Sequence, residues 1–274
     1  MAESRTQHSI IGAKGFIGSH LADTLEANGE PVVRYHRDVW PEPKKHLGHL
    51  YYCIGPTGAA AGSDPQAAHA AHAEILEELM HTSTFDSLTY LSSTRLYRKT
   101  ESTGEDIPII CDPDDPGDLF NLTKLAGETI CLSHKSPTVR VVRLSNVIGK
   151  VIGRDTFLTD IVCQAKANKR IQMQAAAESA KDYIDIKDVV AAVIAIADRG
   201  TRRLYNVATG ENLTQGTVAA IVAGETGAVI EVAENAPVVS FPKIDVSRLQ
   251  SEFPFKPFST RKAIIDVVQN YHSA

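Results

Sequence analysis

Hydrophobic and polar residues alternate with two different periods along the first half of the chain. A short apolar run at 8–11 is followed by a glycine-rich turn and an amphipathic run within 12–30, and then by a second apolar run at 31–36. The simplest interpretation of this order is strand, turn, helix and strand. Strand-like and helix-like runs continue to alternate through segments 50–55, 65–80, 85–93, 119–132 and 138–146.

This repeated alternation indicates a parallel sheet with helices on both faces, because parallel neighbours need crossover connections and helices supply them. We therefore predict a doubly wound α/β fold of the Rossmann type. Beyond Asn146 the pattern loosens, which indicates a small C-terminal substrate lobe interleaved with the first domain. The predicted dinucleotide-binding domain comprises 1–145 and about 177–206, and the predicted lobe comprises about 146–176 and 207–274.

Composition narrows the possible partners. The 274 residues are 43% hydrophobic and 22% charged, and 28 basic against 33 acidic residues give a formal net charge of −5. No broad positive field is available for nucleic acid or an anionic membrane. The longest apolar run, 189–197, is much shorter than the ~20 residues of a membrane span. The four cysteines are dispersed and no signal-like apolar stretch opens the chain, so we expect a cytoplasmic protein without a metal site.

Glycines at fixed spacing follow the first predicted strand. Gly12, Gly15 and Gly18 stand where that strand passes into a helix. In a dinucleotide site the first glycine allows the tight turn, the second lets the backbone approach a pyrophosphate, and the third lets helix and strand pack closely. The helix start, with Phe16 and Ile17, offers backbone N–H groups to the phosphates. The alternative is a glycine-rich turn without a ligand.

The end of the second predicted strand bears on the choice of cofactor. His36 and Arg37 stand at its tip, followed by Asp38. A cation at this position pairs with the 2′-phosphate of NADP, whereas a carboxylate binds the ribose hydroxyls of NAD. We therefore favour NADP. NAD is the second choice, with Arg37 as a surface charge and Asp38 as the ribose ligand.

Two further motifs carry a family resemblance. One is Ser92-Ser93-Thr94-Arg95-Leu96-Tyr97 after a strand, and the other is Phe120-Asn-Leu-Thr-Lys124-Leu-Ala-Gly-Glu128. Together with the glycines, they make the chain resemble an extended short-chain dehydrogenase/reductase of the NAD(P)-dependent nucleotide-sugar epimerase/dehydratase family. The resemblance covers nearly the whole length through segments 143–147, 182–189, 205–207 and 241–247.

The resemblance implies an enzyme whose catalytic residues can be placed by spacing. In the family, a Ser or Thr four positions before a Tyr binds the reacting sugar oxygen, and here that residue is Ser93. The general acid/base is a Tyr four positions before a Lys that holds the nicotinamide ribose. Lys124 is present, but Phe120 stands at the Tyr position. A phenyl group has no hydroxyl and cannot relay a proton.

Three explanations of Phe120 remain open. In the first explanation, which we favour because Ser93 and Lys124 remain, the chain carries an introduced Tyr-to-Phe change in an otherwise active enzyme. Alternatively, it is a naturally non-catalytic NADP-binding module for regulation or interaction. In the third explanation another group, such as Tyr97, has taken over the proton.

The resemblance also implies the substrate and the assembly. The family's dehydratases place Asp-Glu where this chain has Thr94-Arg95, so we expect epimerisation or keto-sugar reduction at carbon 4 of a nucleotide-diphosphate sugar. Ser93, Thr94 and Asn146 are the expected substrate ligands. Candidate cations for the diphosphate are Lys150, Arg154 and Arg248, whose alternative role is surface charge. A homodimer is expected through helices at about 64–82 and 118–135.

Isolated residues support weaker hypotheses. His69 and His72 could share one helix face as metal ligands, but no third ligand is evident, and we expect them to face solvent or an interface. Asp182 and Asp185 precede an apolar helix, for which a capping role is sufficient for at least one. Cys53 is expected to be a small buried hydrophobic residue.

Overall fold

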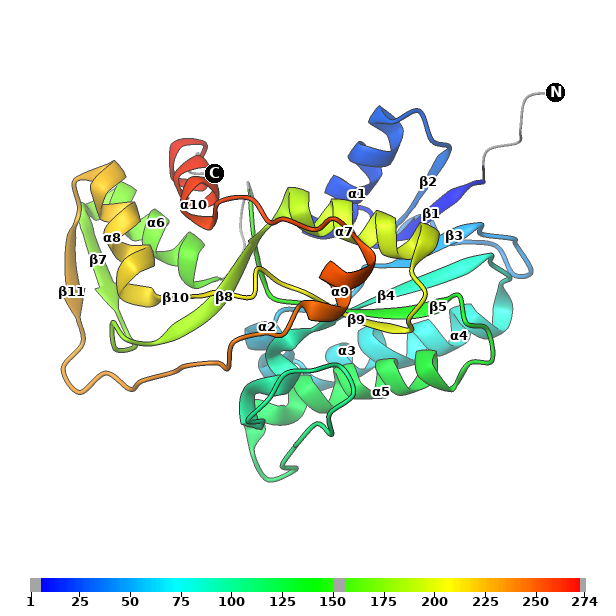
Figure 1. The fold of residues 1–274 in the computed structure, drawn as a ribbon, viewed down its shortest axis with the longest axis horizontal. Coiled ribbons are helices and arrows are strands. Elements are labelled where there is room, and N and C mark those ends of the chain that lie inside the picture. The colour runs from blue at the N-terminus through cyan, green and yellow to red at the C-terminus, as the bar shows by residue number, and fades with distance from the viewer. Residues whose placement is uncertain (1–5, 150–155, 272–274) are drawn as a thin grey trace.

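A parallel sheet of six strands forms the centre of the larger half of the molecule (Figure 1). The computed structural model describes residues 6–149 and 156–271. The strands lie in the order β2-β1-β3-β4-β5-β9, and every neighbouring pair is parallel. Their bounds are β1 (His8–Ile11), β2 (Val32–Tyr35), β3 (His49–Tyr52), β4 (Ser87–Ser93), β5 (Val139–Leu144) and β9 (Leu204–Val207).

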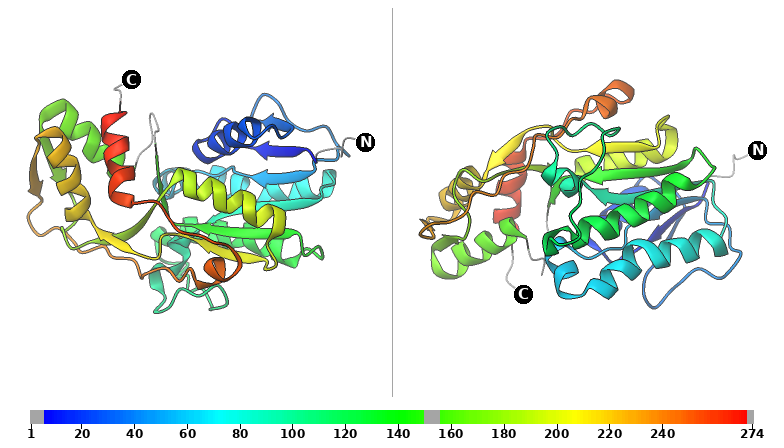
Figure 2. Two further views of the ribbon diagram at one scale, coloured as in Figure 1. Left: turned by 45° about the horizontal axis from the view of Figure 1, so that its top comes forward. Right: turned by 90° about the horizontal axis from the view of Figure 1, so that it is seen from below.

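Helices cover both faces of this sheet (Figure 2). One face carries α1 (Phe16–Ala27) and α7 (Ile186–Arg199), which pack against each other. The opposite face carries α3 (Pro65–His69), the π-helical turn η1 (Ala70–Glu74), α4 (Ile75–Thr82) and α5 (Leu119–Ser133), with the short α2 (Gly58–Ser63) beside α5. The doubly wound α/β fold predicted from the sequence is thus confirmed.

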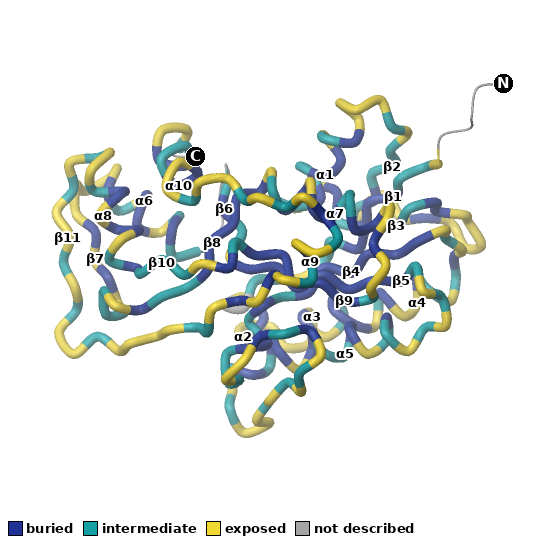
Figure 3. The backbone as a smooth tube through the Cα atoms, viewed as in Figure 1, coloured by how far each residue is buried: buried dark blue, intermediate teal, exposed yellow. Residues whose placement is uncertain are grey.

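Each sheet face has its own apolar core, and the central strands between them are largely buried (Figure 3). Leu21 and Leu25 of α1 meet Val189 and Val193 of α7 in one core. On the other face, Leu76 and Leu79 of α4 pack with residues of the central strands and α5. Within the described residues, no helix has the length and apolar character needed to cross a membrane.

A smaller lobe adjoins the carboxyl ends of the central strands. It contains a three-stranded sheet in the order β10-β8-β6 and a strand pair, β11-β7. Its strands are β6 (Asn146–Ile148), β7 (Arg170–Met173), β8 (Ala180–Asp185), β10 (Asn212–Thr214) and β11 (Val229–Val232). Its helices are α6 (Phe157–Asn168), α8 (Gln215–Thr226) and α10 (Thr260–Gln269), which share a third core.

The two halves of the molecule interleave along the chain. Strand β8 pairs with β6 and β10 of the lobe, although 177–206 was assigned to the dinucleotide-binding domain. Conversely, Leu249 of α9 (Ser247–Glu252) and the following Phe253 belong to the core beside α7, although 207–274 was assigned to the lobe.

The strand order reverses beside β1, and this reversal defines where a ligand can bind. Strand β1 pairs with β2 on one side and β3 on the other. The connection 36–48 between β2 and β3 contains no helix and only isolated bridges, at His36–Val39 and His46–Thr84. In open α/β sheets, the crevice at such a switch point is the usual ligand site.

Candidate active site

The glycine turn has the backbone geometry that a dinucleotide site needs. Gly12 follows β1 with φ of +91°, in the left-handed region that favours glycine. Its N–H and that of Ala13 both donate to the Tyr35 carbonyl, at 3.0 Å. A Cβ added at Gly12 would lie 3.1 Å from the Cys53 carbonyl. The turn is therefore packed closely between the ends of β2 and β3.

Helix α1 starts directly at this turn. Gly15 is its N-cap and offers no side-chain cap, and Phe16 and Ile17 form the first turn. A Cβ added at Gly18 would lie 2.3 Å from the Gly12 oxygen, so only glycine fits where the helix crosses the turn. The structure thus gives Gly12 and Gly18 the close backbone packing expected of them, while Gly15, with φ of −75°, caps the helix.

The tip of β2 carries charges of both signs. The Asp38 carboxylate lies 3.3 Å from the Lys14 ammonium and 3.4 Å from Nδ1 of His36. The hydrogen bond from Lys14 lowers the pKa of Asp38. Arg37 is exposed beside them. Lys14, inside the glycine turn, was not singled out in the sequence because it is brought to Asp38 only by the fold.

Ser93 ends β4 and begins a short 3₁₀ helix, η2 (Thr94–Lys99). Its Oγ accepts a hydrogen bond from the Arg95 N–H at 3.1 Å. The neighbouring Thr94 hydroxyl donates to the Leu144 carbonyl at 3.3 Å. Because the Ser93 oxygen acts as an acceptor towards the backbone, its own proton can be donated to a ligand.

Lys124 lies one helical turn after Phe120 on α5. Its ammonium is buried and donates to the Leu91 carbonyl of β4 at 2.8 Å. It also lies 5.1 Å from the centroid of the Tyr90 ring. Burial lowers the pKa of Lys124 to about 8. The side chain is thus a cation held between helix and sheet that is readily neutralised above neutral pH.

Phe120 contacts a buried histidine that the sequence analysis expected at the surface. The His72 ring meets the Phe120 ring edge-on at 5.4 Å between centroids, and it is completely buried. Its Nδ1 lies 2.9 Å from the Thr123 hydroxyl, while Nε2 has no partner among the described residues. Burial, followed by the charge of Lys124, lowers the pKa of His72 to about 3, so the imidazole is neutral.

The expectation for His72 was wrong because its position faces the core. It shares the inward face of its helix with Leu76 and Leu79, at the i, i+4 and i+7 spacing of a buried helix face. That spacing was visible in the sequence and could have indicated burial. His69, by contrast, is exposed and lies 3.0 Å from Glu74. No metal-binding group of three or more ligand residues exists among the described residues.

An ionic contact holds η2 against the start of α5. Asp118, immediately before α5, is fully buried, and its carboxylate lies 2.6 Å from the Lys99 ammonium and 3.2 Å from Nε of Arg98. Because Ser93 precedes η2 and Lys124 lies on α5, this contact fixes the spacing between the two predicted catalytic residues.

A cavity of about 370 Å³ lies where the carboxyl ends of β3, β4 and β5 meet the lobe. Six of the predicted site residues line it: Ile17, Ser93, Thr94, Phe120, Lys124 and Asn146. Its lobe side includes Phe157, Lys181 and Phe241. Cys53 also lines the cavity, and burial raises the pKa of its thiol, so this residue stays neutral. The volume falls within the range of small-molecule sites.

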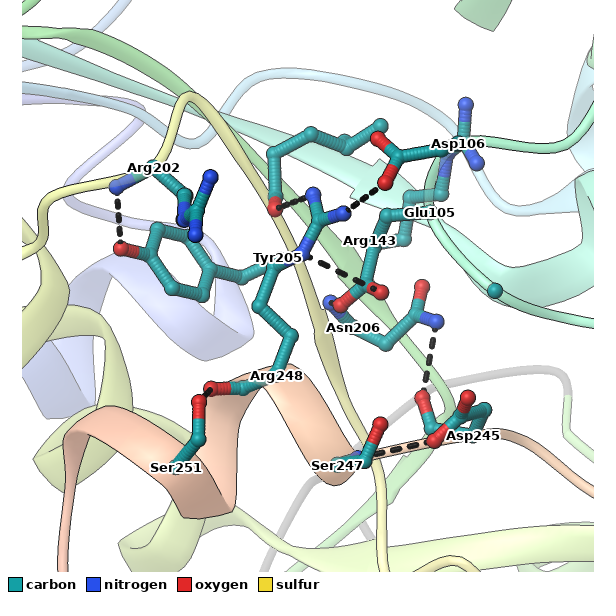
Figure 4. Close-up of polar contacts among 12 residues, drawn as sticks. Glu105, Asp106, Arg143, Arg202, Tyr205, Asn206, Asp245, Ser247, Arg248 and Ser251 are labelled. Atoms are coloured by element: carbon teal, nitrogen blue, oxygen red, sulfur yellow. Dashed lines mark hydrogen bonds and ion pairs between the residues drawn. The ribbon is translucent and has the colours of Figure 1, made fainter.

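Other predicted ligands lie elsewhere. His36 and Arg37, at the tip of β2, do not line this cavity. Lys150 and Arg154 lie outside the described residues. Arg248 also does not line the cavity: Nη1 donates to the Leu204 carbonyl at 3.0 Å, and the guanidinium forms ion pairs with Glu105 and Asp106 (Figure 4). Its charge is therefore already compensated beside β9.

The Tyr97 hydroxyl is held in a buried hydrogen-bond network. The side chain is completely buried, its hydroxyl donates to Asn206 Oδ1 at 2.9 Å, and Nη1 of Arg143 donates to that hydroxyl at 2.7 Å. Burial raises the pKa of Tyr97. Since Tyr97 is not among the residues lining the cavity, the geometry gives no support for proton transfer by this residue.

Comparison with known proteins decides the family. The model of the NAD-dependent epimerase/dehydratase family matches residues 56–208. The chain belongs to this family. The match begins beyond the glycine turn, so the turn geometry is independent support for a dinucleotide site.

The proteins similar to this epimerase/dehydratase family member have names that indicate different activities. A dTDP-4-dehydro-6-deoxy-D-allose reductase from a Streptomyces species is 22% identical, with 96% of this chain and 95% of the relative covered. The structure of RMD from Pseudomonas aeruginosa complexed with NADPH has a TM-score of 0.76 and 20% identity, covering 96% and 97% of the two chains. A tyrosine-to-phenylalanine mutant of UDP-glucuronic acid 4-epimerase from Bacillus cereus, in complex with UDP-4-deoxy-4-fluoro-glucuronic acid and NAD, has a TM-score of 0.79 and 16% identity, covering 96% and 99%.

The residues of this family member fit an NAD(P) cofactor. Gly12 and Gly18 provide the close backbone turn, and Ile17 of the first turn of α1 lines the same cavity as Lys124. A bound nicotinamide would supply hydride chemistry in that cavity.

Proposed function

We propose that this chain is an NAD(P)-dependent oxidoreductase or epimerase that acts on a nucleotide-diphosphate sugar at carbon 4. The observation that carries the proposal is one cavity, at the carboxyl ends of β3, β4 and β5, lined together by Ser93, Phe120, Lys124 and Ile17 of α1. This constellation combines a hydroxyl for the reacting oxygen, a cation for the nicotinamide ribose and the helix start for the phosphates.

Each side chain that lines the cavity has a separate role in the proposed reaction. Ser93 donates its hydroxyl proton to the sugar oxygen while its own oxygen is held by the Arg95 N–H. Lys124, fixed on the Leu91 carbonyl, holds the ribose hydroxyls. Interconversion of an alcohol and a ketone also moves a proton, which Phe120 cannot carry, so the chain in its present form turns over slowly.

The available charges support carbonyl chemistry over elimination of water. Asp182 is the only acidic residue among the described residues that line the cavity. Its Oδ1 accepts from Ser145 at 2.6 Å, and Oδ2 accepts from the Thr209 hydroxyl at 2.7 Å and the Gly210 N–H at 2.8 Å. Its lone pairs are therefore committed, and Thr94-Arg95 supplies no carboxylate. Epimerisation and keto-sugar reduction remain the two candidate reactions.

We propose NADP as the cofactor, with NAD as the second choice. Lys14 already compensates the charge of Asp38, which reduces repulsion of a 2′-phosphate. Arg37 is exposed next to Asp38 and is available to that phosphate. Arg37→Ala should weaken NADPH binding about tenfold and leave NADH binding unchanged.

Restoring the missing hydroxyl tests the function. Phe120→Tyr should raise turnover on a panel of nucleotide sugars by about 10²–10⁴-fold, the usual contribution of a positioned acid/base. Phe157→Tyr is the matched control, because it adds a hydroxyl to the same cavity away from Lys124, and it should give no gain. Interconversion of the two carbon 4 epimers without net cofactor consumption would identify an epimerase, whereas a reductase would consume one reduced cofactor for each sugar converted. A folded Phe120→Tyr protein that turns over no sugar of the panel would contradict the proposal.

One observation favours a second candidate, a non-catalytic NADP-binding module for regulation or interaction. The Phe120 ring packs in an apolar cluster with Ala61 and Ala68 and against the neutral His72 ring. The site thus accommodates phenyl as a packed residue. Cofactor binding without turnover in Phe120→Tyr would support this candidate.

We also propose a cytoplasmic homodimer that forms through α5 and the helices at 65–82. Leu122 is exposed on α5, and Leu125, Ala126 and Thr129 continue the same face at helical spacing. The four free cysteines fit a reducing compartment. Light scattering should give twice the chain mass, and Leu122→Glu should shift the protein to monomer.

A further inference from the structure

The His72 side chain has a buried nitrogen that the proposed reaction does not use. The ring is completely buried, and its Nε2 has no hydrogen-bond partner among the described residues. A buried polar atom without a partner destabilises the fold, and such atoms are rare in folded proteins. The location of this atom, on a ring that packs against Phe120 of the cavity wall, points to a role in the site.

The hydrogen bonds of Thr123 assign the proton of the His72 ring to Nδ1. The Thr123 hydroxyl donates to the Phe120 carbonyl at 3.0 Å. A hydroxyl has one proton, so the Thr123 oxygen acts as the acceptor towards Nδ1 of His72, 2.9 Å away. The neutral imidazole also has one proton, which is therefore on Nδ1. Nε2 is left with a bare lone pair and can only accept a hydrogen bond.

The Lys124 ammonium lies beside this lone pair and has unused protons. The position that a Cβ at Gly55 would occupy lies 2.6 Å from Nε2 of His72 and 3.2 Å from Nζ of Lys124. The two nitrogens thus flank one point, where glycine places no side chain between them. Within residues 6–149 and 156–271, the ammonium makes one hydrogen bond, to the Leu91 carbonyl at 2.8 Å. Two of its three N–H groups remain for other acceptors.

The backbone and the ring of His72 are both held in place. The residue lies in the π-helical turn η1, which packs against α5, and the Tyr90 hydroxyl donates to its carbonyl at 3.2 Å. Such turns inside a longer helix are rare and are frequent at functional sites. The Thr123 contact and the edge-on packing with Phe120 restrain the ring. The lone pair is therefore fixed beside Lys124 before any ligand binds.

Other groups around the ammonium do not use its two remaining N–H groups. The titratable groups that face it are one carboxylate, two thiols and the imidazole: Glu128, Cys53, Cys131 and His72. Glu128 is paired with Arg143. Burial raises the pKa of both thiols, so they stay neutral. Apart from the Leu91 carbonyl, the imidazole lone pair is thus the acceptor suited to stabilise the charged form of Lys124.

We infer that His72 is a positioning residue for Lys124: its Nε2 accepts one N–H of the ammonium and keeps this cation charged and aimed at the cofactor ribose. The role at the ribose rests on the proposed function, whereas the contact between the two side chains belongs to the free chain. A hydrogen bond to the charged form of a group favours that form. Without the lone pair, Lys124 should therefore lose its proton at a lower pH.

Magnetic resonance of the full chain without cofactor tests the contact. Nitrogen spectra of the imidazole should show His72 protonated at Nδ1 only, and protonation at Nε2 would overturn the inference. In protein with isotope-labelled lysine, loss of one signal in Lys124→Met identifies Lys124. Its titration midpoint should fall by about one pH unit in His72→Phe, a tenfold loss of proton affinity, because this variant keeps a ring but removes the lone pair. His72→Gln, which restores an acceptor, should recover at least about half of that difference.

Calorimetric titration with NADPH tests the consequence for the cofactor. Affinity should fall as the pH rises through the Lys124 pKa of about 8, because the ammonium is the form that holds the ribose. In His72→Phe this fall should come about one pH unit lower. The two proteins should then agree within about twofold at pH 6 and differ about fivefold at pH 8, in proportion to the fraction of charged Lys124.

The matched control is His69→Phe, which removes an exposed imidazole three residues earlier on the same helix and should change neither measurement. Weaker NADPH binding by the same factor at pH 6 and pH 8 would give His72 a packing role only and overturn the inference. An unchanged Lys124 titration in His72→Phe would also overturn it. If NADPH binds at no pH, the proposed function fails, whereas the Lys124 titration still decides whether His72 holds the ammonium.

Discussion

Among single residues, Lys124 connects stability with the site most directly. Its ammonium is buried, and burial lowers its pKa to about 8 from the ordinary value of 10.5. Below pH 8 the folded protein bears the full cost of a buried charge. Between pH 8 and 10.5 the unfolded chain binds more protons than the folded one, so this cost disappears as the pH rises.

Lys124→Met should therefore stabilise the protein at pH 7 by about 2 kcal/mol, after allowing for the hydrogen bond to Leu91 that is lost. The difference from the unaltered protein should shrink as the pH approaches 10. Urea unfolding of both proteins at pH 7 and pH 10 measures this. If the variant had a lower free energy of unfolding than the unaltered protein, by the same amount at both pH values, burial of the ammonium would carry no free-energy cost.

At the level of elements, the crossing of α1 over the glycine turn depends on one missing side chain. A Cβ at Gly18 would lie 2.3 Å from the Gly12 oxygen, so backbone must move. Gly18→Ala should cost about 1–3 kcal/mol and weaken cofactor binding at least about tenfold.

The matched control is Gly224→Ala within α8, where an added Cβ meets no atom within 4 Å. It should stabilise the protein by about 0.5–1 kcal/mol and leave cofactor affinity unchanged. Thermal unfolding and fluorescence titration measure both variants. Equal effects of the two changes would refute the packing argument.

The joint between α5 and β5 is a buried ion pair. Arg143 donates to Glu128 at 2.9 and 2.7 Å, and both side chains are almost inaccessible to solvent. Glu128→Ala should cost about 3–5 kcal/mol because it leaves a buried cation unpaired. Glu231→Ala removes the partner of Arg170 at the surface and should cost less than about 1 kcal/mol. Urea unfolding compares them, and similar costs would contradict the buried-charge argument.

For the whole molecule, the sequence predicted the sheet and the residues whose meaning depends on local spacing. The glycines lie at one strand-to-helix turn, and Ser93 and Lys124 line one cavity. The amino-acid sequence does not predict contacts between residues that only the folded chain brings together. His72 and Lys124 come from separate helices, and Arg248 is neutralised by acids far earlier in the chain. The partners of β8 and α9 likewise depend on the folded chain, because local periodicity does not identify them.

The proposed binding of a pyridine dinucleotide at the start of α1 requires no hydroxyl at position 120. The most direct measurement is calorimetric titration of the unaltered protein with NADPH and, separately, with NADH. We expect saturable binding of one dinucleotide per chain, tighter for NADPH. A correctly folded protein that binds neither form would contradict it.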